Sequence, residues 1–338
     1  MKLYGGIDLH SNNSVIGLLD EEDKVVYQQR LPNDLQLVLS ELEPFRNAIS
    51  GLVVESTYNW YWLVDGLMES GYQVHLANTA AIVQYSGLKY ADDDTDACWL
   101  AKLLRLRLLP EGYIYPRVER PVRDLLRKRS QLVHQRTANL QSVQNLMARN
   151  RGQSLSANRV KHLNDQEVDR LLPDADLALA VKSNLAVMQT LGTVIDRLEK
   201  SAKARVKLRP EFELLRTVSG IGEILGLTIM LETGEIGRFA KVGNYASYCR
   251  CVGSERLSNG KRKGRGNTKN GNRYLAWAYI EAANFAVRFN PQIKRYYQRK
   301  RARSNGIVAI KTVAHKLARA CYYILRDQVA FDVNKAFT

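Results

Sequence analysis

Acidic side chains gather where the chain passes from an irregular stretch into a helical one. Four aspartates, Asp92, Asp93, Asp94 and Asp96, fall within five residues, and apolar residues follow them at helical spacing. Asp93 and Asp96 would lie one turn apart on one face of the first helical turn. Aspartate also caps helix starts, and we assign Asp92 and Asp94 to capping or to solvent. Four acids repel one another, and a divalent cation would remove that repulsion.

Two further acids end apolar segments elsewhere in the chain. Asp8 and Glu55 each follow a short run of strand-forming residues. With Asp93 and Asp96 they form the pattern D, E, D-x-x-D. Carboxylates gathered in this way hold two Mg²⁺ ions roughly 3.5–4 Å apart, which activate a nucleophile and stabilise a leaving oxygen at phosphorus. We therefore predict a catalytic Mg²⁺ site, with Mn²⁺ as an alternative ion, formed by these four residues.

The segments around these acids alternate between strand and helix patterns. Strands are predicted at 3–9, 14–19, 24–27, 51–55 and 73–76, and helices at 35–45 and 58–68. The acidic run 20–23 is predicted to be a hairpin turn. This alternation indicates an α/β domain over residues 1–115, and ligands of such sheets bind at the carboxyl ends of the strands. Asp8 and Glu55 occupy two such ends.

Residues 116–206 show two helical patterns with apolar seams. The first seam repeats at seven residues and consists of Leu126, Val133, Leu140 and Met147. The second alternates at four and three and consists of Leu177, Val181, Asn184, Met188, Leu191, Ile195, Leu198 and Ala202. Both are typical of a coiled-coil arm. The seams can pair within one chain as a helical hairpin or between two chains, and we favour the dimerising arm.

Residues 207–338 are predicted to be mainly helical. The stretch 215–225 looks like the turn of a helix-hairpin-helix, in which Gly220 and Gly222 would let backbone N–H groups approach a phosphate. A helix start with two packing glycines is the alternative.

A basic, glycine-rich stretch follows. Between residues 256 and 273 there are seven bases and no acid: Arg256, Lys261, Arg262, Lys263, Arg265, Lys269 and Arg273. Its glycines predict an irregular loop that contacts phosphates. The whole chain has a net charge of +16, which favours a polyanion as partner.

Length and composition limit the remaining classes. A chain of 338 residues indicates two or three domains. We expect a cytoplasmic protein without a membrane partner, because no apolar run reaches roughly 18 residues and no signal-peptide pattern opens the sequence. Cys249 and Cys251 lack a second ligand pair, so we expect them to pack in a core and not to bind zinc.

Short motifs along the chain resemble, in order, those of the insertion-sequence-110 family of transposases, the bridge-RNA-guided serine recombinases. The motifs lie at residues 6–9, 53–55, 89 with 93–97, 218–222, 237–239, 257–261 and 269–275. Each motif is short, but the series spans almost the whole chain and is specific. The resemblance implies an RNase H-like (RuvC-like) N-terminal domain, a coiled-coil arm and a C-terminal transposase domain.

The same resemblance implies residue roles. It assigns the D-E-D-D metal ligands to Asp8, Glu55, Asp93 and Asp96, and the nucleophile to Ser258, the serine before the glycine-rich loop. Here Ser-Asn-Gly replaces the usual Ser-Gly, and residues 252–254 lack the common proline. Ser254 therefore remains a second candidate for the nucleophile.

The function implied is that of a DNA transposase that cuts and rejoins strands through a covalent phosphoserine. Its implied partners are target DNA, donor DNA and a bridge RNA, with a homodimer that becomes a tetramer on DNA at the nucleoid. Two alternatives from other classes stay open. One is a metal-dependent RuvC-like junction nuclease without a covalent intermediate, and the other is a non-catalytic nucleic-acid-binding protein.

Overall fold

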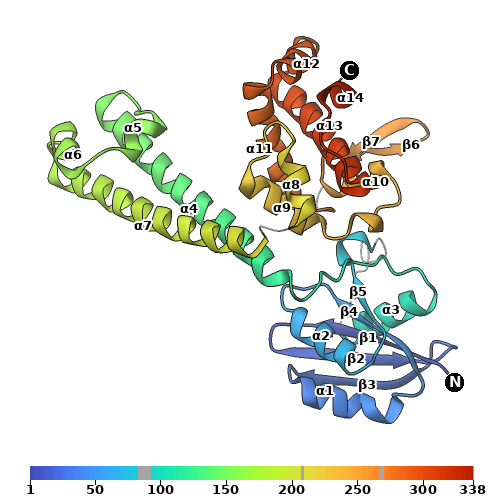
Figure 1. The fold of residues 1–338 in the computed structure, drawn as a ribbon. Coiled ribbons are helices and arrows are strands. Elements are labelled where there is room, and N and C mark those ends of the chain that lie inside the picture. The colour runs from blue at the N-terminus through green and yellow to red at the C-terminus, as the bar shows by residue number, and fades with distance from the viewer. Residues whose placement is uncertain (83–92, 207–208, 254, 266–269, 338) are drawn as a thin grey trace. The chain divides into compact units, whose positions relative to one another are not determined.

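The computed structural model describes residues 1–82, 93–206, 209–253, 255–265 and 270–337. These residues form two compact units, Met1–Arg117 and Val118–Thr338, which are taken in turn (Figure 1). The first unit is an α/β domain, as predicted, and the second is mainly helical.

The first unit is built on a five-stranded mixed sheet. Its elements are β1 (Leu3–Leu9), β2 (Asn13–Leu19), β3 (Val25–Pro32), α1 (Leu35–Leu42), η1 (Glu43–Phe45), β4 (Ile49–Glu55), α2 (Tyr61–Glu69), β5 (Val74–Ala77), η2 (Thr79–Ala81) and α3 (Asp93–Arg105). The strand order is β3-β2-β1-β4-β5. The first three strands form an antiparallel meander, and β4 and β5 run parallel to β1. The predicted strands and helices of this region are confirmed.

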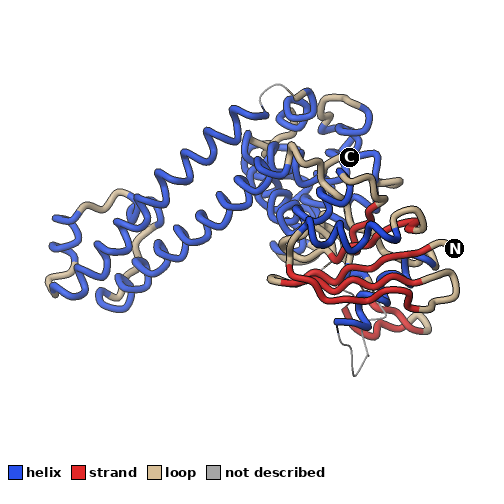
Figure 2. Tube along the Cα trace, turned by 90° about the horizontal axis from the view of Figure 1, so that it is seen from below, coloured by secondary structure: helices blue, strands red, loops and turns tan. Residues whose placement is uncertain are grey.

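Helices cover both faces of this sheet. On one face, side chains of β1, β2 and β4 pack with α1 and α2 in a core that includes Ile7, Val38 and Leu63. On the other face, Val53 and Ala77 pack with Leu100 and Leu103 of α3. Figure 2 shows the red strands of the sheet side by side.

A long helical hairpin begins the second unit. Its elements are α4 (Arg120–Arg151), α5 (Ala157–Lys161), α6 (Asp165–Leu171) and α7 (Ala175–Val206). In both views α4 and α7 run side by side (Figures 1 and 2). Val181, Leu185 and Met188 of α7 form one buried cluster with Val143 and Met147 of α4. The predicted seam of α7 therefore faces α4 of the same chain, as in the helical hairpin, and the dimerising arm stays a prediction.

Helix α7 is also long and apolar enough to cross a membrane by length and composition alone. The apolar window has a mean hydropathy of 1.2, and 28% of it is buried. This corrects the expectation that no segment reaches the length of a membrane span. Val181, Leu185 and Met188 within this helix pack against α4.

The rest of the second unit is a helical domain with one small sheet. Its elements are α8 (Pro210–Arg216), α9 (Glu223–Thr233), η4 (Ile236–Arg238), α10 (Val242–Tyr248), β6 (Glu255–Ser258), β7 (Lys261–Arg265), α11 (Arg273–Phe289), α12 (Pro291–Ala302), α13 (Gly306–Asp327) and α14 (Val333–Phe337). Cys249 is buried in this core, as predicted, and burial raises the pKa of its thiol well above the usual range. The same core includes Val122 of α4 and Ala202 and Val206 of α7, so one end of each long helix packs in it.

Candidate active site

Two of the predicted acids end neighbouring parallel strands. β1 and β4 pair in parallel through Ile7 and Val54. The next residue along each strand is Asp8 on β1 and Glu55 on β4. Asp8 is 5% exposed, so it is held at this sheet edge with little contact to solvent. The parallel register therefore places the two carboxyl groups side by side.

Glycines on the sheet let α3 bring a third acid to the same edge. A Cβ on Gly6 would lie 1.9 Å from the backbone oxygen of Ala97, and one on Gly17 would lie 2.9 Å from Sγ of Cys98. The absence of side chains at both positions allows the backbone of α3 to lie directly on β1 and β2. Asp96, the residue before Ala97, is carried to the strand ends by this contact.

The pKa of Glu55 depends on the other two acids. The pKa of the Glu55 carboxyl is raised from 4.5 to about 8, first by burial, then by a hydrogen bond with Asp8 and by the negative charges of Asp8 and Asp96. Burial disfavours the charged form, and like charges add to that effect. Three acids from distant parts of the sequence thus lie near enough to one another for Asp8 and Asp96 to favour the neutral form of Glu55.

The fourth predicted acid, Asp93, is the first residue of α3, but its side chain lies outside the described structure, as does that of Asp94. Asp92 lies outside the described residues altogether. Among the side chains that are described, no three His, Cys, Asp or Glu residues are grouped closely enough to bind one ion. The set nevertheless has the chemistry of a metal site, because a divalent cation would offset the mutual repulsion of these carboxylates.

A histidine that the sequence patterns did not single out lies beside the acids. His10 Nε2 is 3.3 Å from Asp8 Oδ2. The backbone oxygen of His10 accepts hydrogen bonds from Asn33 Nδ2 (3.0 Å) and Asn59 Nδ2 (2.9 Å), which fix the chain just beyond β1. Its position two residues after a strand-end acid was the available signal.

The predicted nucleophile Ser258 lies in the other unit, at the turn of a β-hairpin. Ser258 ends β6 and pairs with Lys261, the first residue of β7. The two residues between them, Asn259 (φ 52°) and Gly260 (φ 70°), both have positive φ, as two-residue hairpin turns of type I′ require. Ser258 is exposed. The prediction of an irregular loop over this stretch was wrong, because residues 255–265 form a β-hairpin. Asn-Gly between two short strands is a hairpin signal, and here it outweighs the glycine content.

The seven predicted phosphate-contacting bases are distributed over and beyond this hairpin. Lys261 and Lys263 are exposed on β7. Arg273 begins α11, and its guanidinium lies 4.9 Å from the ring centre of Tyr274. The side chains of Arg256, Arg262 and Arg265 lie outside the described structure, as do the whole residues Lys269 and Ser254.

Where the chain returns from the hairpin to α11, it is tightly anchored. Gly271 has φ +87°, and a Cβ there would lie 2.5 Å from the backbone oxygen of Tyr248. The oxygen of Gly271 accepts hydrogen bonds from Arg250 Nε (3.1 Å) and Nη2 (2.8 Å). Asn272 then caps α11, its side chain accepting from the backbone N–H groups of Tyr274 and Leu275.

A buried ion cluster supports that anchor and was missed at the level of sequence. Glu232 on α9 is 2% exposed. Its carboxylate accepts from Arg127 Nε (2.6 Å), Arg123 Nε (3.1 Å) and Asn272 Nδ2 (2.7 Å). Burial alone would raise the pKa of Glu232, but the hydrogen bonds and charges of the two arginines and Asn272 lower it. The cluster joins α4, α9 and the start of α11.

The glycine turn predicted to resemble a helix-hairpin-helix precedes α9. Gly220 has φ +92°, and a Cβ there would lie 2.3 Å from the backbone oxygen of Ala282 on α11. Gly220 is therefore required for packing the turn on α11. Gly222 is the N-cap of α9 without a side-chain cap, and a Cβ there would meet nothing within 4 Å. The packing alternative thus describes Gly220, whereas Gly222 is open to solvent.

Comparison with known proteins covers both units. Residues 5–150 match the DEDD transposase model of IS110 elements, and residues 212–298 match the model described as "Transposase IS116/IS110/IS902 family". A "Probable family 20 transposase" of Pseudomonas aeruginosa is 26% identical over 284 residues, which are 80% of this chain and 82% of that protein. With two models of one family matched in series along both units, the chain belongs to the IS110 family of transposases and is a DNA transposase.

Proposed function

We propose that this transposase cuts and rejoins DNA through a covalent bond to Ser258, with Mg²⁺ held by Asp8, Glu55, Asp93 and Asp96. The observation that carries the metal site is the parallel pairing of β1 and β4 through Ile7 and Val54, which puts Asp8 beside Glu55 while α3 brings Asp96 to the same edge; the raised pKa of Glu55 agrees with this placement. Three acids from separate segments are costly to bring together without a cation to neutralise them. The mixed sheet, with Asp8 and Glu55 at the carboxyl ends of its central parallel pair, supports an RNase H-like domain.

Each residue has a distinct part in this proposal. Bound Mg²⁺, or Mn²⁺ in its place, would act as a Lewis acid on the oxygens of the reacting phosphate. Asp8 and Glu55 would hold the ion at the edge of the sheet, and Asp96 would hold it from α3. His10, 3.3 Å from Asp8, orients that carboxylate.

The serine step conserves the number of phosphoester bonds. The Ser258 oxygen forms a bond to phosphorus, the bond between phosphorus and a deoxyribose oxygen breaks, and the serine proton passes to a base while the leaving oxygen is protonated. A deoxyribose hydroxyl of another strand reverses the step, so rejoining needs no ATP. The exposed position of Ser258 beside the tight Asn-Gly turn supports access to a DNA backbone.

Nucleic-acid partners follow from charge and from the family resemblance. The hairpin 255–265 has Lys261 and Lys263 exposed next to Ser258, and we propose that it contacts DNA phosphates with the other bases of residues 256–273. Guidance by a bridge RNA is proposed from the resemblance to bridge-RNA-guided recombinases. We place the enzyme at the nucleoid in the cytoplasm, as a homodimer that forms a tetramer on DNA. Since the α7 seam is covered by α4, chain-to-chain contact would use other surfaces.

The test separates a recombinase from a hydrolytic nuclease. Nicked DNA carrying a phosphorothioate is incubated with protein, and the covalent adduct is measured after denaturation. We expect Ser258→Ala to abolish adduct and strand transfer while DNA binding and Mg²⁺ binding persist. Loss in Ser254→Ala with full activity in Ser258→Ala would move the nucleophile to Ser254.

Two further outcomes would support the other classes. Activity retained in both serine variants, but lost in Asp8→Ala, would favour the metal-dependent junction nuclease, which the acid cluster alone would serve. Strand transfer that survives Asp8→Ala would refute the proposed metal site. Binding without any strand cleavage in wild type would favour a non-catalytic role.

A further inference from the structure

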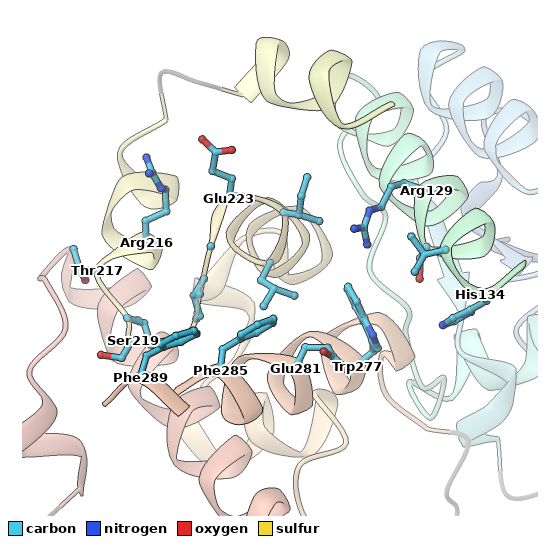
Figure 3. A pocket seen from close by; sticks show the side chains of 18 of the residues that line it. Arg129, His134, Arg216, Thr217, Ser219, Glu223, Trp277, Glu281, Phe285 and Phe289 are labelled. Atoms are coloured by element: carbon cyan, nitrogen blue, oxygen red, sulfur yellow. The ribbon is translucent and has the colours of Figure 1, made fainter. Parts of the chain in front are cut away.

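A large groove in the second unit lies away from Ser258 in sequence and has no role in the steps above. It has a volume of about 1010 Å³ and is lined by α4, the turn 216–222, the start of α9 and one face of α11. Figure 3 shows Trp277, Glu281, Phe285 and Phe289 along α11, with Arg129 and His134 of α4 across from them. We call it the α11 groove. Its volume is at the upper end of the roughly 300–1,000 Å³ typical of ligand sites.

One stripe of α11 forms the floor of the α11 groove. Trp277, Glu281, Phe285 and Phe289 follow one another at four-residue spacing, so they lie on one face of the helix. Phe285 is 43% exposed and Phe289 67% exposed. Their rings are stacked nearly parallel, with centroids 6.3 Å apart and an interplanar angle of 6°. Two parallel aromatic rings that stay exposed in a groove can stack with the flat face of a ligand.

The opposite wall presents groups that suit phosphates. Gly222 caps α9 without a side-chain hydrogen bond, and residues 222–225, which carry first-turn N–H groups of α9, line the groove. Gly220 packs this turn on Ala282 of α11, and Ser219 Oγ accepts a 3.0 Å hydrogen bond from Asn290 Nδ2, so the wall is rigid. Arg129 and Arg216 also line the groove, and each is ion-paired, Arg129 with Glu199 (2.8 Å) and Arg216 with Glu213 (3.2 Å).

Two acids line the same groove, and they differ in their partners. Glu223 forms a 2.5 Å ion pair with Lys203, so its charge is compensated. Glu281 is half-buried between Trp277 and Phe285 on the aromatic stripe. A carboxylate in that position accepts hydrogen bonds from a flat group that carries amino hydrogens. Cytosine, through its N4 amine, is such a group, whereas uracil and thymine are not.

We propose that the α11 groove binds an unpaired nucleic-acid strand, with its bases stacked on Phe285 and Phe289, a phosphate at the first turn of α9, and Glu281 accepting from an amino-bearing base. Aromatic platforms on which bases stack are how proteins bind single strands. The choice of a polyanion rests on the proposed function. Bases of a duplex are already stacked on each other, so the groove selects unpaired strands.

The test uses full-length protein and fluorescein-labelled oligonucleotides of one sequence, as single-stranded RNA, single-stranded DNA and duplex DNA. Phe285→Ala/Phe289→Ala should weaken single-strand binding on the order of ten-fold or more, because each stacked base contributes strongly to affinity. Duplex binding should be nearly unchanged. A 2-aminopurine in the single strand should change its emission on wild type and not on the double variant. The RNA and DNA arms tell which strand the groove prefers.

Matched variants separate stacking from apolar contact. Phe285→Leu/Phe289→Leu keeps apolar surface but lacks the flat rings, and should behave like the alanine pair. Ile307→Ala removes another exposed apolar side chain, 72% exposed on α13, and should bind as wild type. Glu281→Gln should reduce the preference for oligo(C) over oligo(U) several-fold without weakening oligo(U).

Specific results would overturn this inference. Unchanged single-strand affinity in the double alanine variant, or full affinity in the leucine pair, removes the stacking platform. A lower mass by light scattering in the alanine pair, with unchanged oligonucleotide affinity, would make the groove a contact between copies of the chain. Failure of the proposed function is read separately, from strand transfer in Asp8→Ala, a residue outside this unit.

Discussion

The raised pKa of Glu55 predicts that the metal-free protein loses stability as the pH rises. The Glu55 carboxyl has a pKa of 4.5 ordinarily and about 8 in the folded chain. Between these values the folded state binds more protons than the unfolded state, so raising the pH favours unfolding. The stability associated with Glu55 is therefore present near pH 5 and is lost as the pH passes through the folded pKa.

The size of the effect follows from that shift. From about pH 5 to about pH 8, linkage gives a loss of roughly 3–4 kcal/mol for an isolated group. Glu55 is only partly buried, and solvent screening reduces this to about 2 kcal/mol. In a unit of this size, such a loss lowers the unfolding midpoint by roughly 5–10 °C. Glu55→Gln cannot ionise, so it should be the more stable protein at pH 8 and nearly equal to wild type at pH 5.

Thermal unfolding followed by tryptophan fluorescence is the assay, in EDTA and across that pH range. Trp60, Trp62 and Trp99 lie in the Met1–Arg117 unit, so the signal reports mainly that unit. Mg²⁺ at about 100 times its dissociation constant should stabilise wild type by about 2.7 kcal/mol and the variant by much less. Glu22→Gln, an exposed acid of the same unit, is the control and should keep the wild-type slope. An equal pH slope in wild type and Glu55→Gln would refute the coupling of Glu55 to Asp8 and Asp96.

Three further changes test the scaffold. Gly6→Ala would put a Cβ 1.9 Å from the Ala97 oxygen, so thermal unfolding should show a loss of about 1–3 kcal/mol and calorimetry a weaker Mg²⁺ affinity. Gly51→Ala is the control, because its Cβ would meet only side chains, Leu104 at 3.3 Å and His75 at 3.5 Å, and it should bind Mg²⁺ normally. Glu232→Ala leaves Arg123 and Arg127 without their buried partner and should cost about 3–5 kcal/mol in urea unfolding, and a cost below about 1 kcal/mol would contradict the cluster. Met188 lies in the seam that faces α4 of the same chain, so Met188→Asp should lower the helicity seen by circular dichroism and leave the mass seen by light scattering unchanged. Dissociation of a dimer with intact helicity would show instead that the seam pairs between chains.

Local patterns were sufficient for the elements and for the two strand-end acids. Alternating and buried runs specify strands such as Leu3–Leu9 and Ile49–Glu55, and the acid at or near the end of each stands in the sequence itself. Parallel strands of one sheet bring their carboxyl ends to the same edge, so the strand pattern alone was enough to pair Asp8 with Glu55. The helical spacing after Asp93 predicted α3 in the same way.

Contacts between distant segments could not be read in this way. That Gly6 and Gly17 admit α3, that His10 approaches Asp8, and that α7 pairs with α4 depend on which surfaces meet after the chain has folded. An apolar seam shows that a helix packs against another helix, but it does not show whether that helix belongs to the same chain. The free energy gained by burying apolar surface is the same in both cases. The burial of Glu232 could not be predicted from the sequence either, because most glutamates are exposed to solvent. Only the tertiary structure places it between Arg123 and Arg127, where it forms buried ion pairs.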